Sequence, residues 1–433
     1  MIEEITILLL AGGKSTRFWP LTNKMRMKFT NISLITHQIN FLNKAGFKNI
    51  TVVVSEGLKP YIEDRNVRIV LQKGVGMGAA VLSAAEYIQN HPVLVVIADD
   101  IVELSLFQKL NQVCDSSGHI MVGYKTSHYF PGGYLVLDGQ RIAKIHEKPG
   151  KGNEPSNYVY MSSNFFTDAS LLLTYLEKFK DENPNNSYEL ALSNMMSQGE
   201  RFNMMEYSGI WLTLKYPWQT LRVMDYYLGK IKRKKISASA QVHKTATIIG
   251  NVVLEKGVRV MENAKLVGPL YIDENTIIGN HVLVRESMIG RNCVVGYNCD
   301  VTRSYISNNC WFHSNYVGDS VIADNVAMGA GAVLANLRLD EGEILSSVND
   351  EKIHTRLKKL GAMIGDCARI GIGAQLMPGI KVGVHSVIGP GVILAEDVGD
   401  EQTCFIEQKL TLVKNKYTTS SDRESFRQKL KSA

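Results

Sequence analysis

The sequence lacks several features that mark common protein classes. Across 433 residues, no apolar run reaches the roughly 18 residues that a membrane span needs. The start, Met1–Ile5, is acidic where a secretion signal would be basic. The net charge of +6 is too weak for a chain of this length to indicate nucleic-acid binding. We therefore expect a cytoplasmic protein with no membrane or nucleic-acid partner.

Paired cysteine motifs are also missing. The six cysteines, at positions 114, 293, 299, 310, 367 and 404, include no Cys-x-x-Cys pair. This spacing argues against a zinc ribbon and against a disulfide framework. With 45% hydrophobic and 21% charged residues, the composition is that of an ordinary folded protein. At about 150 residues per domain, the length predicts two or three domains.

The first part of the chain alternates strand-like and helix-like segments. Three apolar runs are typical of buried parallel strands: Ile5–Leu10, Thr51–Val54 and Val93–Ala98. Helix-like segments separate them, at residues 34–45 and 79–88. This alternation predicts an α/β domain over residues 1–235, with a mostly parallel sheet covered by helices. Ligands of such a domain bind beyond the carboxyl ends of the strands.

The pattern changes after residue 236, where apolar residues recur every five or six positions. The first of them are Val242, Ile248, Leu254, Val260, Leu266, Ile272, Ile278 and Val284. This is the hexapeptide repeat of a parallel β-helix, in which stacked coils share one continuous core. We expect the β-helix to span residues 236–405, with a loop leaving it at 335–363. A polar tail, predicted to be helical, follows at 406–433.

The glycine-rich segment Leu10–Thr22, LAGGKSTRFWPLT, follows the first predicted strand. Its small residues would let backbone N–H groups approach phosphate oxygens, and a basic side chain could neutralise their charge. It fits neither the GxxxxGK[ST] nor the GxGxxG pattern. It resembles the signature loop of sugar-1-phosphate nucleotidyltransferases, roughly LAGGxGTRxxPLT. The resemblance implies a Rossmann-like domain, a catalytic Arg17, and nucleotide contacts from Leu10, Ala11, Gly12, Gly13, Ser15 and Thr16.

Further segments extend this resemblance. Gln72, with Gly76 and Gly78, is similar to the segment that contacts the base in this family. Residues 95–100 resemble the strand that ends at a magnesium-binding Asp, which makes Asp100 the metal ligand. An Asp at a strand tip suits a hard cation that also takes phosphate oxygens, whereas the pair Asp99-Asp100 by itself would indicate turn capping. The family's sugar contacts correspond to Gly133, Glu147, Lys148 and Asn164.

The resemblance also implies a reaction. Such enzymes join a sugar 1-phosphate to a nucleoside triphosphate and release pyrophosphate, with Mg²⁺ as cofactor. The protein aligns two anions and neutralises charge at the α-phosphoryl group, so it needs neither a nucleophile nor a general base. Relatives favour UTP or dTTP with a glucose-type hexose 1-phosphate. The main alternative is a non-catalytic homologue that senses a nucleotide or nucleotide sugar.

Two departures from the family pattern bear on this alternative. The family has a Pro-Lys pair beyond the signature loop, and this chain has no Pro there, so that Lys24, Arg26 or Lys28 would replace the lysine. The family's second magnesium Asp corresponds to Thr213, and a following Gly to Lys215. A hydroxyl is a poor magnesium ligand beside a carboxylate. We hypothesise that Lys215 supplies positive charge instead.

The second half resembles bifunctional N-acetylglucosamine-1-phosphate uridylyltransferases that also acetylate glucosamine 1-phosphate. The resemblance lies in residues 313–320, 329–336 and 356–366. It implies a left-handed β-helix and a second site that uses acetyl-CoA, with His313 as general base. The other implied contacts are Tyr316, Asn336, Arg285 and Arg303.

One segment of this half departs from its relatives. Residues 337–343 are acidic where relatives carry lysines, which favours the alternative of a β-helix that serves as a scaffold. In either case we expect a homotrimer or a larger homo-oligomer.

Overall fold

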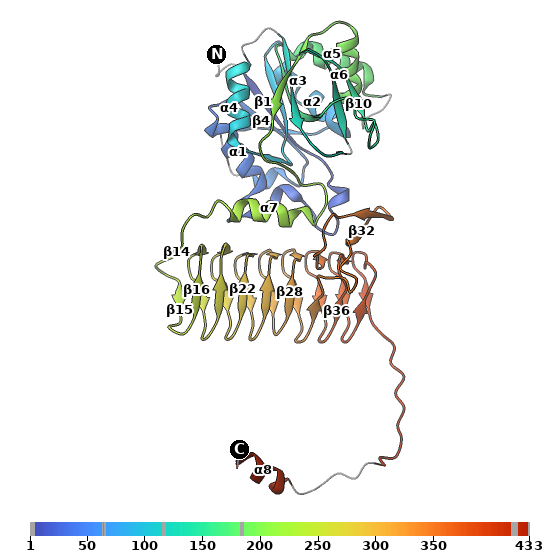
Figure 1. Ribbon diagram of the computed structural model, residues 1–433. Coiled ribbons are helices and arrows are strands. Elements are labelled where there is room, and N and C mark those ends of the chain that lie inside the picture. Colours follow the sequence, from blue (N-terminus) through green and yellow to red (C-terminus); the bar gives the residue numbers. More distant parts are fainter. Residues whose placement is uncertain are drawn as a thin grey trace.

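The computed structural model describes residues 5–62, 64, 66–114, 118–130, 132–139, 141–181, 186–416 and 423–431. Residues 1–4, part of the acidic start discussed above, lie outside this range. An α/β domain sits on a long β-helix (Figure 1). None of the helices within the described ranges has the length and apolar character needed to cross a membrane.

The α/β domain is built on a sheet with nine described strands. In spatial order they are β5 (Arg68–Leu71), β4 (Ile50–Val54), β1 (Thr6–Ala11), β6 (Val93–Ile97), β11 (Tyr158–Phe166), β8 (His119–Lys125), β12 (Phe202–Tyr207), β10 (Arg141–Glu147) and β9 (Gly133–Asp138). The first four run parallel, and the remainder of the sheet is mixed. The three predicted strands are β1, β4 and β6, which confirms the parallel part of the prediction.

Helices cover both faces of this sheet. One group comprises α1 (Leu34–Lys44), α4 (Leu104–Val113) and α7 (Gln219–Leu228), and the other α2 (Gly76–Ser83), α3 (Ala85–Ile88), α5 (Ala169–Phe179) and α6 (Ser187–Ser197). Alternate side chains of β1 point to opposite faces. Ile7 and Leu9 join the core of the first group, and Leu8 and Leu10 that of the second. Burial on both faces explains why β1 is a continuous apolar run.

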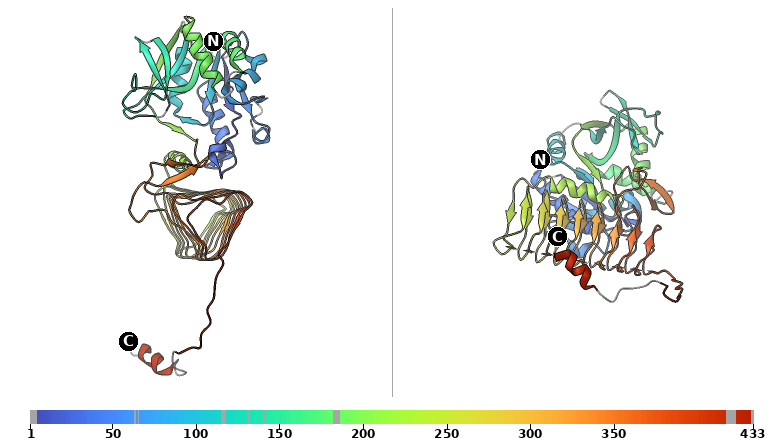
Figure 2. Two further views of the ribbon diagram at one scale, coloured as in Figure 1. Left: turned by 90° about the vertical axis from the view of Figure 1, so that its right-hand side faces the viewer. Right: turned by 60° about the horizontal axis from the view of Figure 1, so that its bottom comes forward.

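The β-helix consists of three parallel sheets, seen end-on as a triangle (Figure 2). Sheet 1 contains β14 (Lys235–Ile236), β17 (Val252–Leu254), β20 (Leu270–Ile272), β23 (Met288–Ile289), β26 (Tyr305–Ile306), β29 (Val321–Ile322), β34 (Met363–Ile364) and β37 (Lys381–Val382). Sheet 2 contains β15 (Gln241–Val242), β18 (Arg259–Val260), β21 (Ile277–Ile278), β24 (Val294–Val295), β27 (Trp311–Phe312), β30 (Ala327–Met328), β35 (Arg369–Ile370), β38 (Val387–Ile388) and β40 (Thr403–Cys404). Sheet 3 contains β16 (Thr247–Ile249), β19 (Lys265–Val267), β22 (Leu283–Arg285), β25 (Asp300–Thr302), β28 (Tyr316–Gly318), β31 (Val333–Leu334), β36 (Gln375–Leu376) and β39 (Ile393–Leu394).

The repeat residues fill the inside of this triangle. Leu254, Ile272 and their equivalents in later coils are buried in one continuous core, which confirms the left-handed β-helix. The predicted loop at 335–363 leaves the stack as an antiparallel hairpin, β32 (Leu345–Val348) with β33 (Glu351–His354). After the last coil, residues 405–416 leave the β-helix without regular secondary structure (Figure 1), and α8 spans Glu424–Lys431.

Sheet 1 has an apolar outer face as well as an apolar inner face. In most of its coils the residue before the inward-facing one is also buried, and it packs into the core of the α/β domain: Val253, Tyr271, Met288, Tyr305, Val321 and Met363. Helix α7 runs along this face (Figure 1). The two domains therefore share a hydrophobic core across their interface.

Candidate active site

The signature loop connects β1 to a short turn of 3₁₀ helix, η2 (Thr16–Phe18). A side chain at Gly12 would collide with Gln72, which donates from Nε2 to the carbonyl oxygens of Gly74 and Gly76 at 3.2 Å. Ser15, where the family pattern has Gly, has a left-handed φ of 54°. The structure thus brings the predicted nucleotide residues of the loop together with Gln72 at the carboxyl end of β1.

The nearby Gly78 serves helix packing in this structure. It is buried, and a side chain there would collide with Ser187 of α6. Because α2 carries glycine at this point, the two helices approach closely.

Two carboxylates follow β6. Asp99 is the last residue of the connection between β6 and β7 (Asp100–Val102), and Asp100 is the first residue of β7. Strand β7 pairs with β13 (Trp211–Thr213), and in this pairing Thr213 lies opposite Asp100. The backbone N–H of Leu214 donates to the carbonyl oxygen of Asp99 at 3.1 Å. Thr213, which the resemblance aligns with the family's second Asp, thus lies directly opposite Asp100.

Charges around the two carboxylates decide between the replacement lysines. Lys24, in the 3₁₀ turn η3 (Lys24–Arg26), forms an ion pair with Asp99. Lys28 lies in β2 (Lys28–Phe29), against the β-helix. Its backbone N–H donates to the Tyr305 hydroxyl at 3.2 Å, and that hydroxyl donates to the carbonyl oxygen of Lys28 at 3.0 Å. Of these two predicted lysines, Lys24 is the one that contacts the carboxylates after β6.

Asp100 is held in an unusual electrostatic state. Loss of water around its carboxyl and the neighbouring charge of Asp99 raise the pKa of Asp100 to about 7, against the opposing charges of Lys215 and Lys24. Asp100 thus has less positive charge around it than its ionised form needs. An added cation at this point would favour the carboxylate form.

The two carboxylates suit a divalent cation by their chemistry. Both offer hard oxygen donors at a strand tip. No group of three His, Cys, Asp or Glu side chains that could enclose a metal occurs in the described part of the chain. The residues therefore fit an ion that takes its remaining ligands from phosphate oxygens.

A buried glutamine fixes the segment that carries these carboxylates. Gln38 of α1 donates from Nε2 to the carbonyl oxygens of Ala98 and Asp100, at 2.9 and 2.8 Å. Sequence analysis missed this role. The one available signal is a polar residue among the apolar positions of a buried helix face.

The predicted sugar residues come from three neighbouring strands. Gly133 of β9 lies opposite Glu147 of β10, and a Cβ at Gly133 would lie 2.6 Å from Glu147 Oε1. Glu147 and Lys148 are exposed, and Lys148 has a left-handed φ of 43°. Asn164 of β11 is fully buried and donates from Nδ2 to the hydroxyls of Tyr160 and Tyr188, at 2.7 and 3.0 Å.

Two acceptors in this area are buried without hydrogen-bond partners among the described residues. They are Oδ1 of Asn164 and Oε2 of Glu189, which lies in the first turn of α6. Burial raises the pKa of Glu189, and the charge of Glu147 adds to this effect. Sequence analysis missed Glu189, because an acid in the first turn of a helix is ordinarily an exposed residue that favours the helix dipole.

The predicted second site spreads along sheet 3. His313 lies at the corner before β28, it is exposed, and its imidazole makes no hydrogen bond to any described residue. Tyr316 and Asn336 converge over Gly318, since a Cβ there would lie 2.7 Å from the Tyr316 hydroxyl and 2.6 Å from Asn336 Nδ2. Tyr316 and Asn336 therefore come together, while His313 lies at the opposite end of the short strand β28.

The predicted phosphate-binding arginines of this half already have partners. Arg303 forms a two-pronged contact with Asp319 at 2.7 and 2.8 Å, and Asp319 also accepts from Asn336. Arg285 lies 3.9 Å from Asp300. Arg303 is therefore neutralised by a neighbouring carboxylate, whereas the buried Nε of Arg285 has no hydrogen-bond partner among the described residues.

The signature loop also contacts the β-helix. Trp19 donates from Nε1 to Asp400 at 2.9 Å, and the Thr22 hydroxyl donates to Asp366 at 3.1 Å. The ammonium group of Lys381 lies 5.0 Å from the centre of the Trp19 ring. The last coils of the β-helix thus hold the end of the loop.

Comparison with known proteins decides the family. Residues 6–214 match the family model of nucleotidyl transferases. Over 409 residues, 90% of this chain and 97% of the relative, the chain is 32% identical to a bifunctional sugar-1-phosphate nucleotidylyltransferase/acetyltransferase of Sulfurisphaera tokodaii. The chain belongs to this family. It is also 28% identical to the bifunctional protein GlmU of Methanococcus maripaludis, over 94% of this chain and 99% of that protein.

Family membership confirms the function expected from the signature loop. The protein is a sugar-1-phosphate nucleotidyltransferase, and its relatives carry an acetyltransferase function as well.

Proposed function

We propose that this nucleotidyltransferase couples a hexose 1-phosphate to UTP or dTTP with Mg²⁺ and releases pyrophosphate. The observation that carries the proposal is the position of Asp100 at a strand tip beside the signature loop, next to a second carboxylate, Asp99. Carboxylate oxygens at such a point are the donors that a magnesium ion prefers. A magnesium ion bound there would neutralise the nucleotide phosphates.

The remaining residues have roles that follow from their positions. Lys24 and Arg17 supply positive charge around the α-phosphoryl group, where charge develops during transfer. Lys215 supplies positive charge near Asp100, in the segment where Thr213 takes the place of the family's second carboxylate. Glu147 and Asn164 accept hydrogen bonds from sugar hydroxyls, which aligns the attacking phosphate with the α-phosphorus.

The test is pyrophosphate release, measured over four nucleoside triphosphates and several sugar 1-phosphates with Mg²⁺. We expect turnover with UTP or dTTP. Asp100→Asn should lower kcat by about 100-fold or more, the order seen when a single charge-stabilising group is lost. The exposed Asp138, at the end of β9, provides the control substitution Asp138→Asn, which should leave kcat unchanged.

Other outcomes would contradict the proposal. A thermal shift with nucleotide but no turnover for any substrate pair would indicate the nucleotide-sensing alternative. An unchanged rate in Lys215→Ala would remove the role of Lys215 while leaving that of Asp100.

We also propose acetyl transfer from acetyl-CoA to an amino sugar 1-phosphate at sheet 3. The favouring observation is the convergence of polar atoms of Tyr316 and Asn336, with the exposed imidazole of His313 at the other end of β28. Because Arg303 is already bonded to Asp319 within the chain, the proposed site takes further residues from a second copy, as in a homotrimer assembled through β-helix faces.

Release of free thiol from acetyl-CoA with glucosamine 1-phosphate tests this second activity. His313→Ala should abolish the signal, and His385→Ala, at another exposed corner of the β-helix, should preserve it. Sedimentation of the active protein should show a trimer or larger assembly. A fully active monomer would contradict the shared site.

A further inference from the structure

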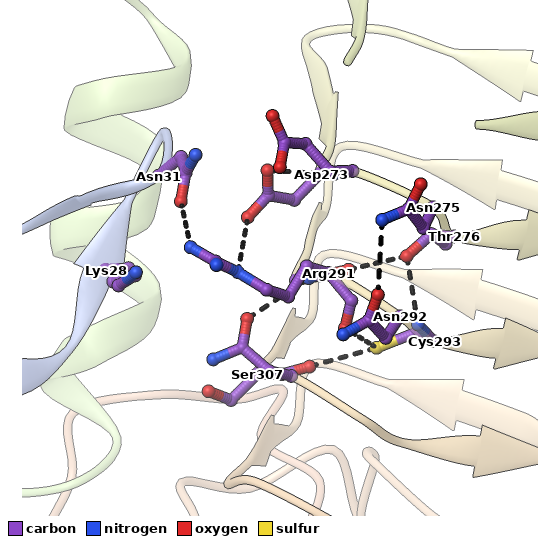
Figure 3. A network of polar contacts seen from close by, with 12 residues as sticks. Lys28, Asn31, Asp273, Asn275, Thr276, Arg291, Asn292, Cys293 and Ser307 are labelled. Atoms are coloured by element: carbon purple, nitrogen blue, oxygen red, sulfur yellow. Dashed lines mark hydrogen bonds and ion pairs between the residues drawn. The ribbon is translucent and has the colours of Figure 1, made fainter. Parts of the chain in front are cut away.

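A cavity lies between the two domains, and Arg26 of η3 lines it. Its volume is about 510 Å³, within the range of about 300–1,000 Å³ that is usual for small-molecule sites. One wall comes from residues 21–36 and Tyr61, and the other from β-helix residues 291–366. Figure 3 shows part of it, with Lys28 and Asn31 on one wall and Arg291 reaching across from the other.

Three cations from both domains line this cavity: Arg26, Lys28 and Arg291. The Arg26 guanidinium lies 3.9 Å from the centre of the Tyr61 ring, and Arg291 donates to Asn31 Oδ1 at 3.0 Å. Arg291 also lies 3.9 Å from the buried carboxylate of Asp273, which balances part of its charge. Among the described residues, no carboxylate pairs with Arg26, and Lys28 Nζ makes no hydrogen bond. Arg26 and Lys28 therefore leave positive charge for an anion.

Two carboxylates in the same cavity are fixed by neutral donors. Asp324 accepts from the Asn308 backbone N–H at 2.8 Å and from Asn308 Nδ2 at 3.0 Å. Asp366 accepts from Thr22 and from the backbone N–H of Asp324 at 2.9 Å. Their free lone pairs suit hydroxyl donors. Cations, fixed acceptors and the rings of Tyr61 and Tyr305 together match a phosphorylated sugar better than a bare anion.

The cavity is linked to the candidate active site through a single turn. Lys24 and Arg26 both belong to η3, whose middle residue, Met25, is buried. Lys24 pairs with Asp99, and Arg26 faces the cavity. A ligand that fixes Arg26 therefore also fixes the turn that positions Lys24.

We propose that this interdomain cavity binds a sugar phosphate as an effector, distinct from the substrate, and thereby lowers the KM for the nucleoside triphosphate. The effect on KM rests on the proposed role of Lys24, whereas binding itself does not. Fixing η3 in advance removes part of the ordering that nucleotide binding otherwise requires.

Glucose 6-phosphate is the probe, because it has no phosphate at C1 and cannot enter the transfer reaction. Calorimetry on the full chain without nucleotide should show one site per chain. Arg291→Gln and Arg26→Gln should each weaken binding at least tenfold, whereas Arg259→Gln, on an exposed part of sheet 2, and Asp100→Asn should not. A thermal melt of each variant separates lost binding from lost folding, and Arg26, which has only a ring contact, is the less disruptive of the two sites.

Three outcomes would overturn the proposal. The first is no binding by the parent protein. The second is binding that Glu147→Gln abolishes and Arg291→Gln leaves intact, which would place the probe in the sugar site. The third is equally tight binding of inorganic phosphate, which would exclude recognition of the sugar.

Kinetics test the effector role separately. Saturating glucose 6-phosphate should lower the KM for the active nucleotide at least threefold in the parent and leave it unchanged in Arg291→Gln. Binding without this change in KM would contradict the effector role. Binding without any nucleotidyl transfer would contradict the proposed function while leaving the cavity assignment intact.

Discussion

The two candidate sites differ in how their polar groups are satisfied. In the α/β domain, Asp100 has a raised pKa, and buried acceptors of Asn164 and Glu189 have no hydrogen-bond partner among the described residues. On the β-helix, Arg303 and Asn336 both bond Asp319, whereas Nε of Arg285 and Oδ1 of Asp300 are buried without a hydrogen-bond partner among the described residues. In the first site the predicted ligand-binding residues themselves carry the groups without partners, whereas in the second the hydrogen bonds around Asp319 are complete and those around Arg285 are not.

This difference bears on how each site would work. Buried groups without partners lower the stability of the free protein and favour ligands that restore those contacts. Groups that already pair must exchange partners before they can bind, so a neighbouring chain or a rearrangement has to contribute. Substitutions in each site test this difference between them.

The largest expected effect concerns Asp319. Asp319→Asn removes the charge that holds Arg303 and should lower the free energy of unfolding by about 1–3 kcal/mol. The pair Arg285–Asp300 is more exposed, so Asp300→Asn should change it by less than about 1 kcal/mol. Urea unfolding measures both. Equal effects would show that the β-helix charges are not held as the contacts indicate.

Substitution of Glu189 should raise the free energy of unfolding rather than lower it. Because its pKa is raised in the folded protein, its ionised form is destabilising, and this cost appears as pH rises above the unfolded pKa of about 4.3. Glu189→Gln should therefore stabilise the protein at pH 8 by about 1 kcal/mol, and this gain should vanish near pH 4. The KM for the sugar 1-phosphate should rise, with that for the nucleotide unchanged. Thermal melts at both pH values measure the change in stability. A gain in stability that is independent of pH would rule out the electrostatic cause.

The smallest effect lies in the backbone. Tight turns of the β-helix place Asn in the left-handed region, as at Asn263 and Asn292, whereas the signature loop places Ser15 there. Ser15→Gly relieves this conformation but loses more chain entropy, so it should stabilise by at most about 1 kcal/mol. Ser208→Gly, at an exposed site with ordinary φ, should instead destabilise slightly. Differential scanning calorimetry compares the two variants. A lower Tm for Ser15→Gly than for Ser208→Gly would contradict the inferred backbone strain at Ser15.

The sequence predicted features that depend on local pattern. The apolar run of β1, the six-residue repeat and the position of Asp100 after a strand all follow from neighbours in the chain. The ion pair of Lys24 with Asp99, on which our proposal for Lys24 rests, did not, because it depends on which way each residue of one turn faces. The burial of the Glu189 carboxyl and the pairing of Arg303 with Asp319 did not either, because both depend on how separate segments of the chain pack.

The shared core between the domains has a consequence for how the protein unfolds. Tyr271, Met288 and Tyr305 lie on the outside of the β-helix yet are covered by the α/β domain. A chain cut after residue 235 would leave an apolar surface exposed on each fragment, and both fragments would be prone to aggregate. Heating the intact chain should therefore melt both halves in one cooperative step.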